Sequence, residues 1–256
     1  MGVGAGRFGA FWAALDAVPV EPDAEALFDV STPEGALRRT NLSRYLDHVG
    51  PAADTLLVAE APGWRGMTNT GVPFTSMREL GALGFDALVP PEPTAPWEAS
   101  SRVVQAALAE WVGPLPLTWA IFPHHPFVAP DRLTNRTPRP AEVREGAPVA
   151  LALLDALGGA RGAGGAGGAG GGAGGGAGAP GDGAGASGDG AGASGDGEGV
   201  PAGGRVRVGG RVRVVAVGRK AQGALALAGI DAVAVRHPAQ GGARQFTEEM
   251  RALNGR

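Results

Sequence analysis

The stretch TLLVAEAPG, residues 55–63, decides the fold that we predict for this chain. Its first half is an apolar run typical of a buried strand, and its terminal Pro-Gly pair ends the strand and begins a loop. A similar run at residues 232–235 leads into a second loop, which carries His237. Loops at the carboxyl ends of parallel strands converge on one crevice of an open α/β sheet. The sequence therefore predicts that Glu60, Phe74 and His237 lie in one cleft, although they are widely separated along the chain.

The rest of the chain alternates segments with strand and helix patterns. Short connections between such elements indicate parallel strands with right-handed crossovers. We therefore predict an α/β fold, a three-layer α/β/α sandwich with a central four-stranded parallel sheet. Strands are predicted at residues 55–59, 117–122, 212–217 and 232–235. Helices are predicted at residues 8–15, from about 32 to 46, from a capping box at Ser76 and Glu79, and at 100–112, 137–157, 221–228 and 243–253, with Pro148 bending or dividing the helix at 137–157.

Residues 158–204 differ sharply in composition from the rest of the chain. They are almost entirely Gly and Ala, and the heptapeptide GAGASGD occurs at 183–189 and again at 190–196. Because they offer no large apolar side chain to bury, they cannot offset an ordering cost of about 1–2 kcal/mol per residue. We expect a disordered insertion in a single domain formed by residues 1–157 and 205–256. Its matches to a dinucleotide-binding glycine pattern follow no strand and are compositional.

The formal net charge of −3 is carried by the insertion, so the remainder is neutral. Positive charge nevertheless crowds the last quarter of the chain. These side chains either are solvated residues that flank a strand or form a face that binds phosphates. The basic residues concerned are Arg205, Arg207, Arg211, Arg213, Arg219, Lys220, Arg236 and Arg244.

The chain has no cysteine, which excludes disulfides, thiol catalysis and cysteine-ligated zinc or iron–sulfur clusters. No apolar run approaches the roughly 18 residues of a membrane span, and Asp16 interrupts the apolar N-terminal stretch, so we expect neither a span nor a signal peptide. His124 and His125 lack any metal-ligand spacing, and we expect no metal and no cofactor. A cytoplasmic monomer is the expectation.

Three residues at predicted strand ends and loops have both a structural and a functional interpretation. Glu60 either caps a neighbouring backbone amide or orients a water and stabilises positive charge in a cleft. Phe74 either packs in the core or offers a stacking surface to a flat ligand. His237, held in extended geometry by the proline that follows it, is either a buried hydrogen-bonding residue or a group that faces a ligand.

Five short motifs, in this order, resemble those of the uracil-DNA glycosylase superfamily. They are EAPG at 60–63, GxPF at 71–74, NRTP at 135–138, AVGRxA at 216–221 and RHPA at 236–239. The resemblance runs from about residue 41 to 246 without the insertion, and it is nearest to bacterial members similar to the iron–sulfur branch but without its cysteines. It implies a four-stranded parallel sheet between helices. It also implies hydrolysis of the N-glycosidic bond of a damaged base that is flipped out of the duplex.

The resemblance further implies a role for each matched residue. Glu60 and the backbone of Pro62 and Gly63 would flank the deoxyribose and the attacking water. Phe74 would stack on the flipped base, and His237 would donate a hydrogen bond to O2 of the departing uracil anion. Expected contacts to the DNA backbone come from a helix N-terminus, two glycines and two arginines, namely Ser76, Gly241, Gly242, Arg236 and Arg244.

One position departs from the pattern of the superfamily. An asparagine that reads the edge of the base usually ends the second strand, and Ala120 stands at the best-aligned position here. A site without that reader discriminates less well between bases. We therefore predict a DNA glycosylase that removes uracil or a related deaminated base, with a catalytically impaired module that binds DNA or lesions as the alternative. A third interpretation, a generic Rossmann-type nucleotide-binding protein, is disfavoured because the chain contains no phosphate-loop signature.

Overall fold

The computed structural model describes residues 6–93, 97–159 and 212–254. Residues 160–211, which include nearly all of the predicted insertion together with Arg205, Arg207 and Arg211, lie outside this part of the chain. The remaining predicted elements fall within the described residues.

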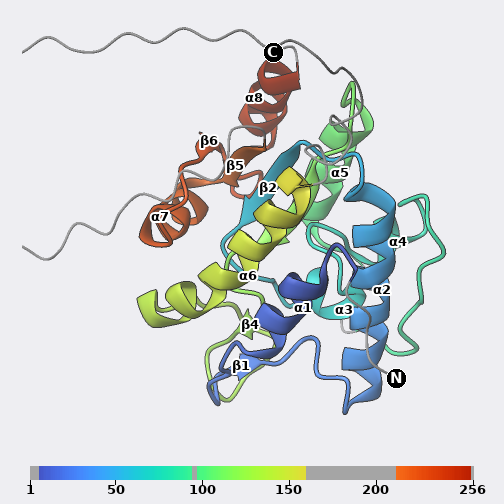
Figure 1. Ribbon diagram of the computed structural model, residues 1–256, viewed down its shortest axis with the longest axis vertical. Helices are drawn as coiled ribbons and strands as arrows, with labels where there is room; N and C mark the ends of the chain where they lie inside the picture. Colours follow the sequence, from blue (N-terminus) through green and yellow to red (C-terminus); the bar gives the residue numbers. More distant parts are fainter. Residues whose placement is uncertain (1–5, 94–96, 160–211, 255–256) are drawn as a thin grey trace, which may run out of the picture.

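A four-stranded parallel sheet forms the centre of the molecule (Figure 1), as predicted. Its strands are β2 (Thr55–Ala59), β3 (Leu117–Ala120), β5 (Arg213–Val217) and β6 (Val233–Val235), in the order β3-β2-β5-β6. Strand β2, which contains the start of the TLLVAEAPG stretch, pairs with β3 on one side and with β5 on the other. All four strands run in one direction, so their carboxyl ends share one edge of the sheet.

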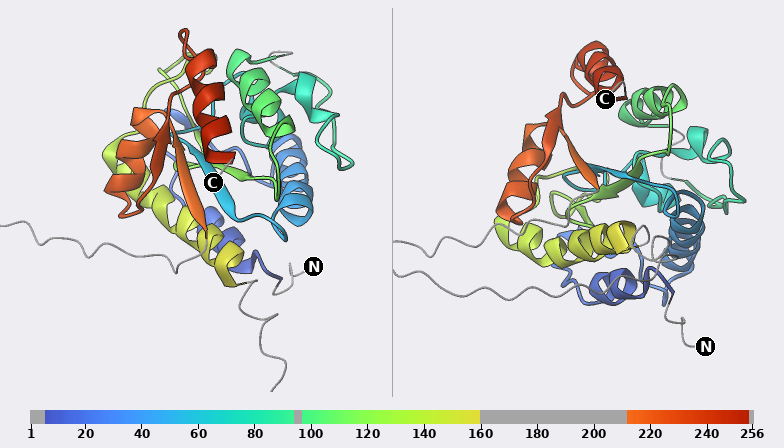
Figure 2. Two further views of the ribbon diagram at one scale, coloured as in Figure 1. Left: turned by 90° about the horizontal axis from the view of Figure 1, so that it is seen from above. Right: turned by 45° about the horizontal axis from the view of Figure 1, so that its top comes forward.

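Helices cover both faces of the sheet and complete the predicted three layers (Figure 2). Alternate side chains of β2 point to opposite faces, because successive residues of a strand do so: Leu56 and Val58 join one apolar cluster and Leu57 the other. The first cluster is covered by α1 (Gly9–Asp16), α2 (Pro33–Val49), α6 (Pro140–Gly159) and α7 (Arg219–Leu227). The second is covered by α5 (Ala99–Ala109) and α8 (Ala243–Asn254).

The helices form where the sequence patterns predict them, but α5 ends at Ala109 rather than at residue 112, and α6 also differs. The predicted starts of α2 and of the short α4 (Met77–Leu80) are confirmed: Thr32 accepts a hydrogen bond from the Gly35 amide, and Ser76 and Glu79 form the expected capping box. Helix α6 begins at Pro140 rather than near residue 137. It continues through Pro148 as a single helix, so the proline does not divide it.

Three short elements were not predicted. Strands β1 (Ala24–Glu25) and β4 (His125–Pro126) form a two-stranded antiparallel sheet, and α3 (Met67–Thr70) follows the EAPG loop. Of the helices in the described part of the chain, none is both long enough and apolar enough to cross a bilayer.

Candidate functional site

A cavity of about 1010 Å³ opens where the four parallel strands end. Each strand, or the residue just after it, contributes to the lining: Glu60 after β2, Ala120 at the end of β3, Gly218 after β5 and Val235 at the end of β6. The crevice predicted from strand order therefore exists, and its volume is of the size that binds nucleotide-sized ligands.

The structure brings most of the predicted site residues together in this cavity. Ser76 and Arg244 do not line it: Ser76 is fully buried and its hydroxyl contacts Glu79, whereas Arg244 is exposed and lies 3.8 Å from Glu248. The predicted residues that do line it are Glu60, Pro62, Gly63, Phe74, Ala120, Arg236, His237, Gly241 and Gly242.

His237 stands on the loop after β6 with one ring nitrogen already occupied. Its Nδ1 accepts a hydrogen bond from the amide of Ala239 at 3.1 Å, so a neutral ring carries its proton on Nε2. Burial lowers the pKa of this imidazole, the carboxylate of Glu98 raises it, and Arg236 and Lys220 lower it further; the net direction is downward. At neutral pH the ring is thus an uncharged hydrogen-bond donor, and Nε2 has no partner among the described residues.

Gly218 allows the imidazole to come this close to the sheet. Its φ of 91° lies in the left-handed region, and a Cβ at this position would sit 2.9 Å from Cβ of His237. A side chain at position 218 would therefore be strained and would displace the histidine. The glycine of the AVGRxA motif fixes the distance between the ends of β5 and β6.

Glu60 is half-buried at the end of β2, and its backbone carbonyl accepts the amide of Phe122, which extends the β2–β3 pairing. Burial raises the pKa of its carboxyl group, and the nearby Lys220 offsets part of that effect. A carboxylate whose pKa moves toward neutrality is better suited to accept a proton from water. No hydrogen bond ties it to a backbone amide among the described residues, contrary to the capping interpretation.

Phe74 adopts a backbone conformation that is uncommon for its residue type. Its φ is 51°, in the left-handed region, where aromatic side chains are disfavoured. Hydrogen bonds hold it there, because Gln105 donates to its carbonyl at 3.1 Å and Thr118 donates to the carbonyl of Pro73 at 3.2 Å. The half-buried ring packs against the second apolar cluster and also lines the cavity. Strain of this kind is concentrated at functional sites.

The Thr118 hydroxyl is itself part of a buried network. Tyr45 lies 2.9 Å from it and accepts the Thr118 amide at the same distance. Burial raises the pKa of Tyr45 to about 12, so the phenol remains a donor. The chain of contacts from α2 through β3 to Pro73 fixes the loop that presents Phe74.

The EAPG loop is fixed from the opposite side by residues 125–135. His125 is fully buried, and its Nδ1 lies 3.0 Å from the carbonyl of Pro62. Asn135 accepts the amide of Trp64 through Oδ1 at 3.1 Å, and it lines the cavity. The NRTP motif therefore supports the EAPG loop directly.

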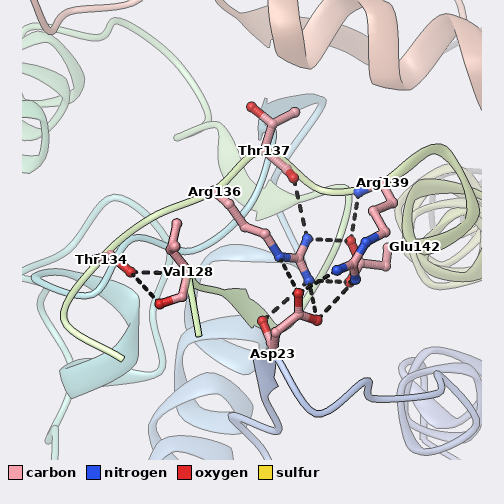
Figure 3. Close-up of polar contacts among 7 residues, drawn as sticks. All are labelled: Asp23, Val128, Thr134, Arg136, Thr137, Arg139 and Glu142. Carbon is pink, nitrogen blue, oxygen red and sulfur yellow. Dashed lines mark hydrogen bonds and ion pairs between the residues drawn. The ribbon is translucent and has the colours of Figure 1, made fainter. Parts of the chain in front are cut away.

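Arg136 anchors that motif to the body of the protein, as Figure 3 shows. Its guanidinium donates to both carboxylate oxygens of Asp23, at 2.9 and 3.1 Å, and of Glu142, at 2.6 and 2.7 Å. Burial by itself would raise the pKa of Glu142, but hydrogen bonds from Arg136 and from the Arg139 amide outweigh it and lower that pKa. Glu142 also accepts the Arg139 amide, which sets the start of α6 at Pro140.

Among the polar cavity residues to which no individual role was assigned from the sequence are Asn135, Lys220 and Glu98. Asn135 belongs to a quoted motif and Lys220 to the basic cluster, so both carried a signal. Glu98 carried almost none, since it stands just before a helix, at a position where glutamate is not a preferred cap. In the structure it lines the cavity and faces Gly63.

His124 is buried, and neither ring nitrogen has a partner within the described residues. Burial lowers the pKa of its imidazole to about 4. Within the same part of the chain, no three His, Asp or Glu side chains are grouped as metal ligands would be.

Among the solved structures similar to this chain is the crystal structure of wild-type SMUG2 of Pedobacter heparinus. The similarity covers 96% of this chain and 97% of that one. Its sequence identity is 11% and its TM-score 0.47. No protein-family model and no curated protein matches the chain. Likeness of this degree assigns no activity to the chain.

Proposed function

We propose that this protein is a DNA glycosylase that hydrolyses the N-glycosidic bond of uracil or a related deaminated base. One observation supports this most strongly: all five motifs contribute residues to a single cavity. The residues include Glu60, Phe74, Asn135, Gly218 and His237, one from each motif. The cavity holds a carboxylate, an aromatic ring and a neutral imidazole donor, which are the groups this reaction requires.

His237 stabilises the departing base. As the bond from C1′ to the base breaks, its electron pair passes to the base, and negative charge develops on the pyrimidine oxygen O2. The Nε2–H of the neutral ring donates a hydrogen bond to that oxygen and keeps its proton, while the Ala239 amide occupies Nδ1. A preorganised donor at the site of developing charge is worth about 3 kcal/mol or more.

Glu60 accepts a proton from the attacking water. The water oxygen forms a bond to C1′ of the sugar, and one water proton passes to the Glu60 carboxylate and from there to the base anion, which leaves as the neutral base. Its raised pKa suits this exchange, because the carboxylate must both accept and release the proton.

Phe74 supplies a wall on which the flipped base stacks. Extrusion of a nucleotide from the duplex costs a few kcal/mol, which stacking against an aromatic ring partly restores. The cavity rim carries exposed positive side chains, Arg219, Lys220 and Arg236, which suit contacts to the DNA backbone near the flipped nucleotide.

Ala120 favours a second candidate, a module that binds lesions without excising them. It is 1% exposed at the end of β3 and offers a methyl group in place of a base-reading amide. Both candidates use the same cavity and the same DNA, and they differ in whether the base is released.

Replacing Glu60 with glutamine tests the proposal. Single-turnover assays would use labelled oligonucleotides that contain uracil, hypoxanthine or xanthine. The wild type should release at least one of these bases, and Glu60→Gln should lower that rate about 10²-fold, because the amide cannot accept the water proton. If the wild type binds these oligonucleotides but releases no base from any of them, the glycosylase is rejected and the binding module is favoured.

The rate of base release should rise with pH and then level off. Glu60 must be ionised, and burial raises the pKa of its carboxyl; His237 must be neutral, and burial lowers the pKa of its imidazole. Both groups therefore limit the reaction on the acidic side, and neither limits it above neutrality. Single-turnover rates across mildly acidic to mildly alkaline buffers check this, and a rate that declined just above neutrality would contradict it.

A further inference from the structure

We propose that Glu98 is a second catalytic carboxylate of the cavity, which stabilises positive charge on the deoxyribose as the base departs. The inference rests on the proposed glycosylase function. It assigns a charge-stabilising role to a side chain from the start of α5, on the opposite face of the sheet from α6 and α7.

The position of the carboxylate supports this role. Glu98 lines the cavity beside the EAPG loop, whose Gly63 is expected to flank the sugar. A Cβ on Gly63 would lie 3.3 Å from Oε1 of Glu98, and a Cβ on Gly66 would lie 2.2 Å from Oε2. A side chain at position 66 would therefore push the carboxylate away from its present position, and one at position 63 would contact it closely.

The side chain does not serve as a helix cap. Glu98 is the residue before α5, but its carboxylate accepts no backbone amide of the first turn. The buried Ser101 hydroxyl donates to Oε2 at 2.8 Å and leaves Oε1 on the Gly63 side. The hydroxyl therefore orients the carboxylate toward the loop that lines the cavity.

The charge of Glu98 also acts on the imidazole. It raises the pKa of His237, opposing the effects of burial, Arg236 and Lys220. An anion that lies near both Gly63 and His237 is placed beside the sugar and the departing base. In the transition state the sugar is an oxocarbenium ion, and a fixed carboxylate beside it stabilises that cation.

A pair of sugar analogues tests the role of the charge directly. One duplex carries a cationic pyrrolidine in place of the deoxyribose, and the other carries a neutral tetrahydrofuran. The full-length wild type should prefer the cation, and Glu98→Gln should lose about tenfold of that preference while binding the neutral duplex unchanged. The same variant should release uracil about tenfold more slowly at single turnover.

Glu110→Gln provides the matched control. Glu110 follows the other end of α5, where its carboxylate pairs with Arg251 on the surface, so the preference and the rate should equal those of the wild type. A preference that is unchanged in Glu98→Gln would overturn the inference, whatever happens to the rate, because a carboxylate that read the base edge or only supported the fold would leave the two sugar analogues equally affected. A wild type that releases no base would reject the proposed function instead.

Discussion

Replacing His237 with alanine should slow base release about 10²–10³-fold at single turnover, with DNA affinity nearly unchanged. The structure gives the physical reason. The ring is held on the loop after β6 in the tautomer that carries the proton on Nε2, and no other described residue occupies that proton. The donor is therefore available where negative charge develops on the base, and its interaction is stronger in the transition state than with the bound substrate. The rate constant at saturating enzyme measures this directly.

His48→Ala is a suitable control for that experiment. His48 is exposed in the last turn of α2, beside Phe85, and does not line the cavity. Its removal should leave the rate within error of the wild type. Should His237→Ala release uracil as fast as His48→Ala, the assignment of the histidine as the donor to the base would be wrong.

Arg136→Met should lower the free energy of unfolding by about 3 kcal/mol, at the lower end of the range for breaking a buried ion pair. Arg136 is 15% exposed and Glu142 is 2% exposed, so removing the guanidinium leaves a carboxylate charge in the interior. For a domain of this size the loss corresponds to about 6–12 °C in melting temperature. Thermal or chemical unfolding of the purified variant measures it.

Arg139→Met is the matched comparison, because Arg139 contacts the same two carboxylates, Asp23 and Glu142. Its side chain is 51% exposed, so water can replace much of its interaction and the melting temperature should fall by less than half as much. Equal losses in the two variants would show that burial does not distinguish the two arginines.

The same cluster makes stability depend on acidity. Hydrogen bonds from Arg139 and then from Arg136 lower the pKa of Asp23 to about 2, although burial opposes them. A carboxyl group with a lowered pKa contributes stability above its ordinary pKa of 3.8 and loses that contribution as the pH falls toward 2. Part of the acid unfolding of this protein should therefore arise from Asp23.

The sheet and its cavity could be predicted because their signals are local. Apolar runs such as Leu56–Val58 specify strands, and a proline or glycine after each run marks where it ends. Parallel order then brings the strand ends together without any knowledge of side-chain contacts, and Glu60 and His237 follow from it.

Features that depend on contacts distant in sequence were out of reach. The start of α6 at Pro140 is set by Glu142 within a cluster that includes Asp23, more than a hundred residues away. From the sequence, Glu98 is only the residue before a predicted helix. In the structure, the packing of α5 places its carboxylate next to Gly63 and Gly66. The sequence indicated the capping box of Ser76, but the burial of that residue depends on the packing around it.

The hydrogen bonds around Phe74 bear on how a lesion would be selected. Gln105 and Thr118 fix the loop from two elements, so this wall of the cavity behaves as part of the core rather than as a movable flap. On the proposed reaction, the nucleic acid must supply the deformation that brings a base to the ring. Nucleotides that are mispaired or weakly stacked need the least distortion to reach it. Mechanical compliance of the DNA would then sort substrates before any chemistry begins, a form of selection that does not need an amide at position 120.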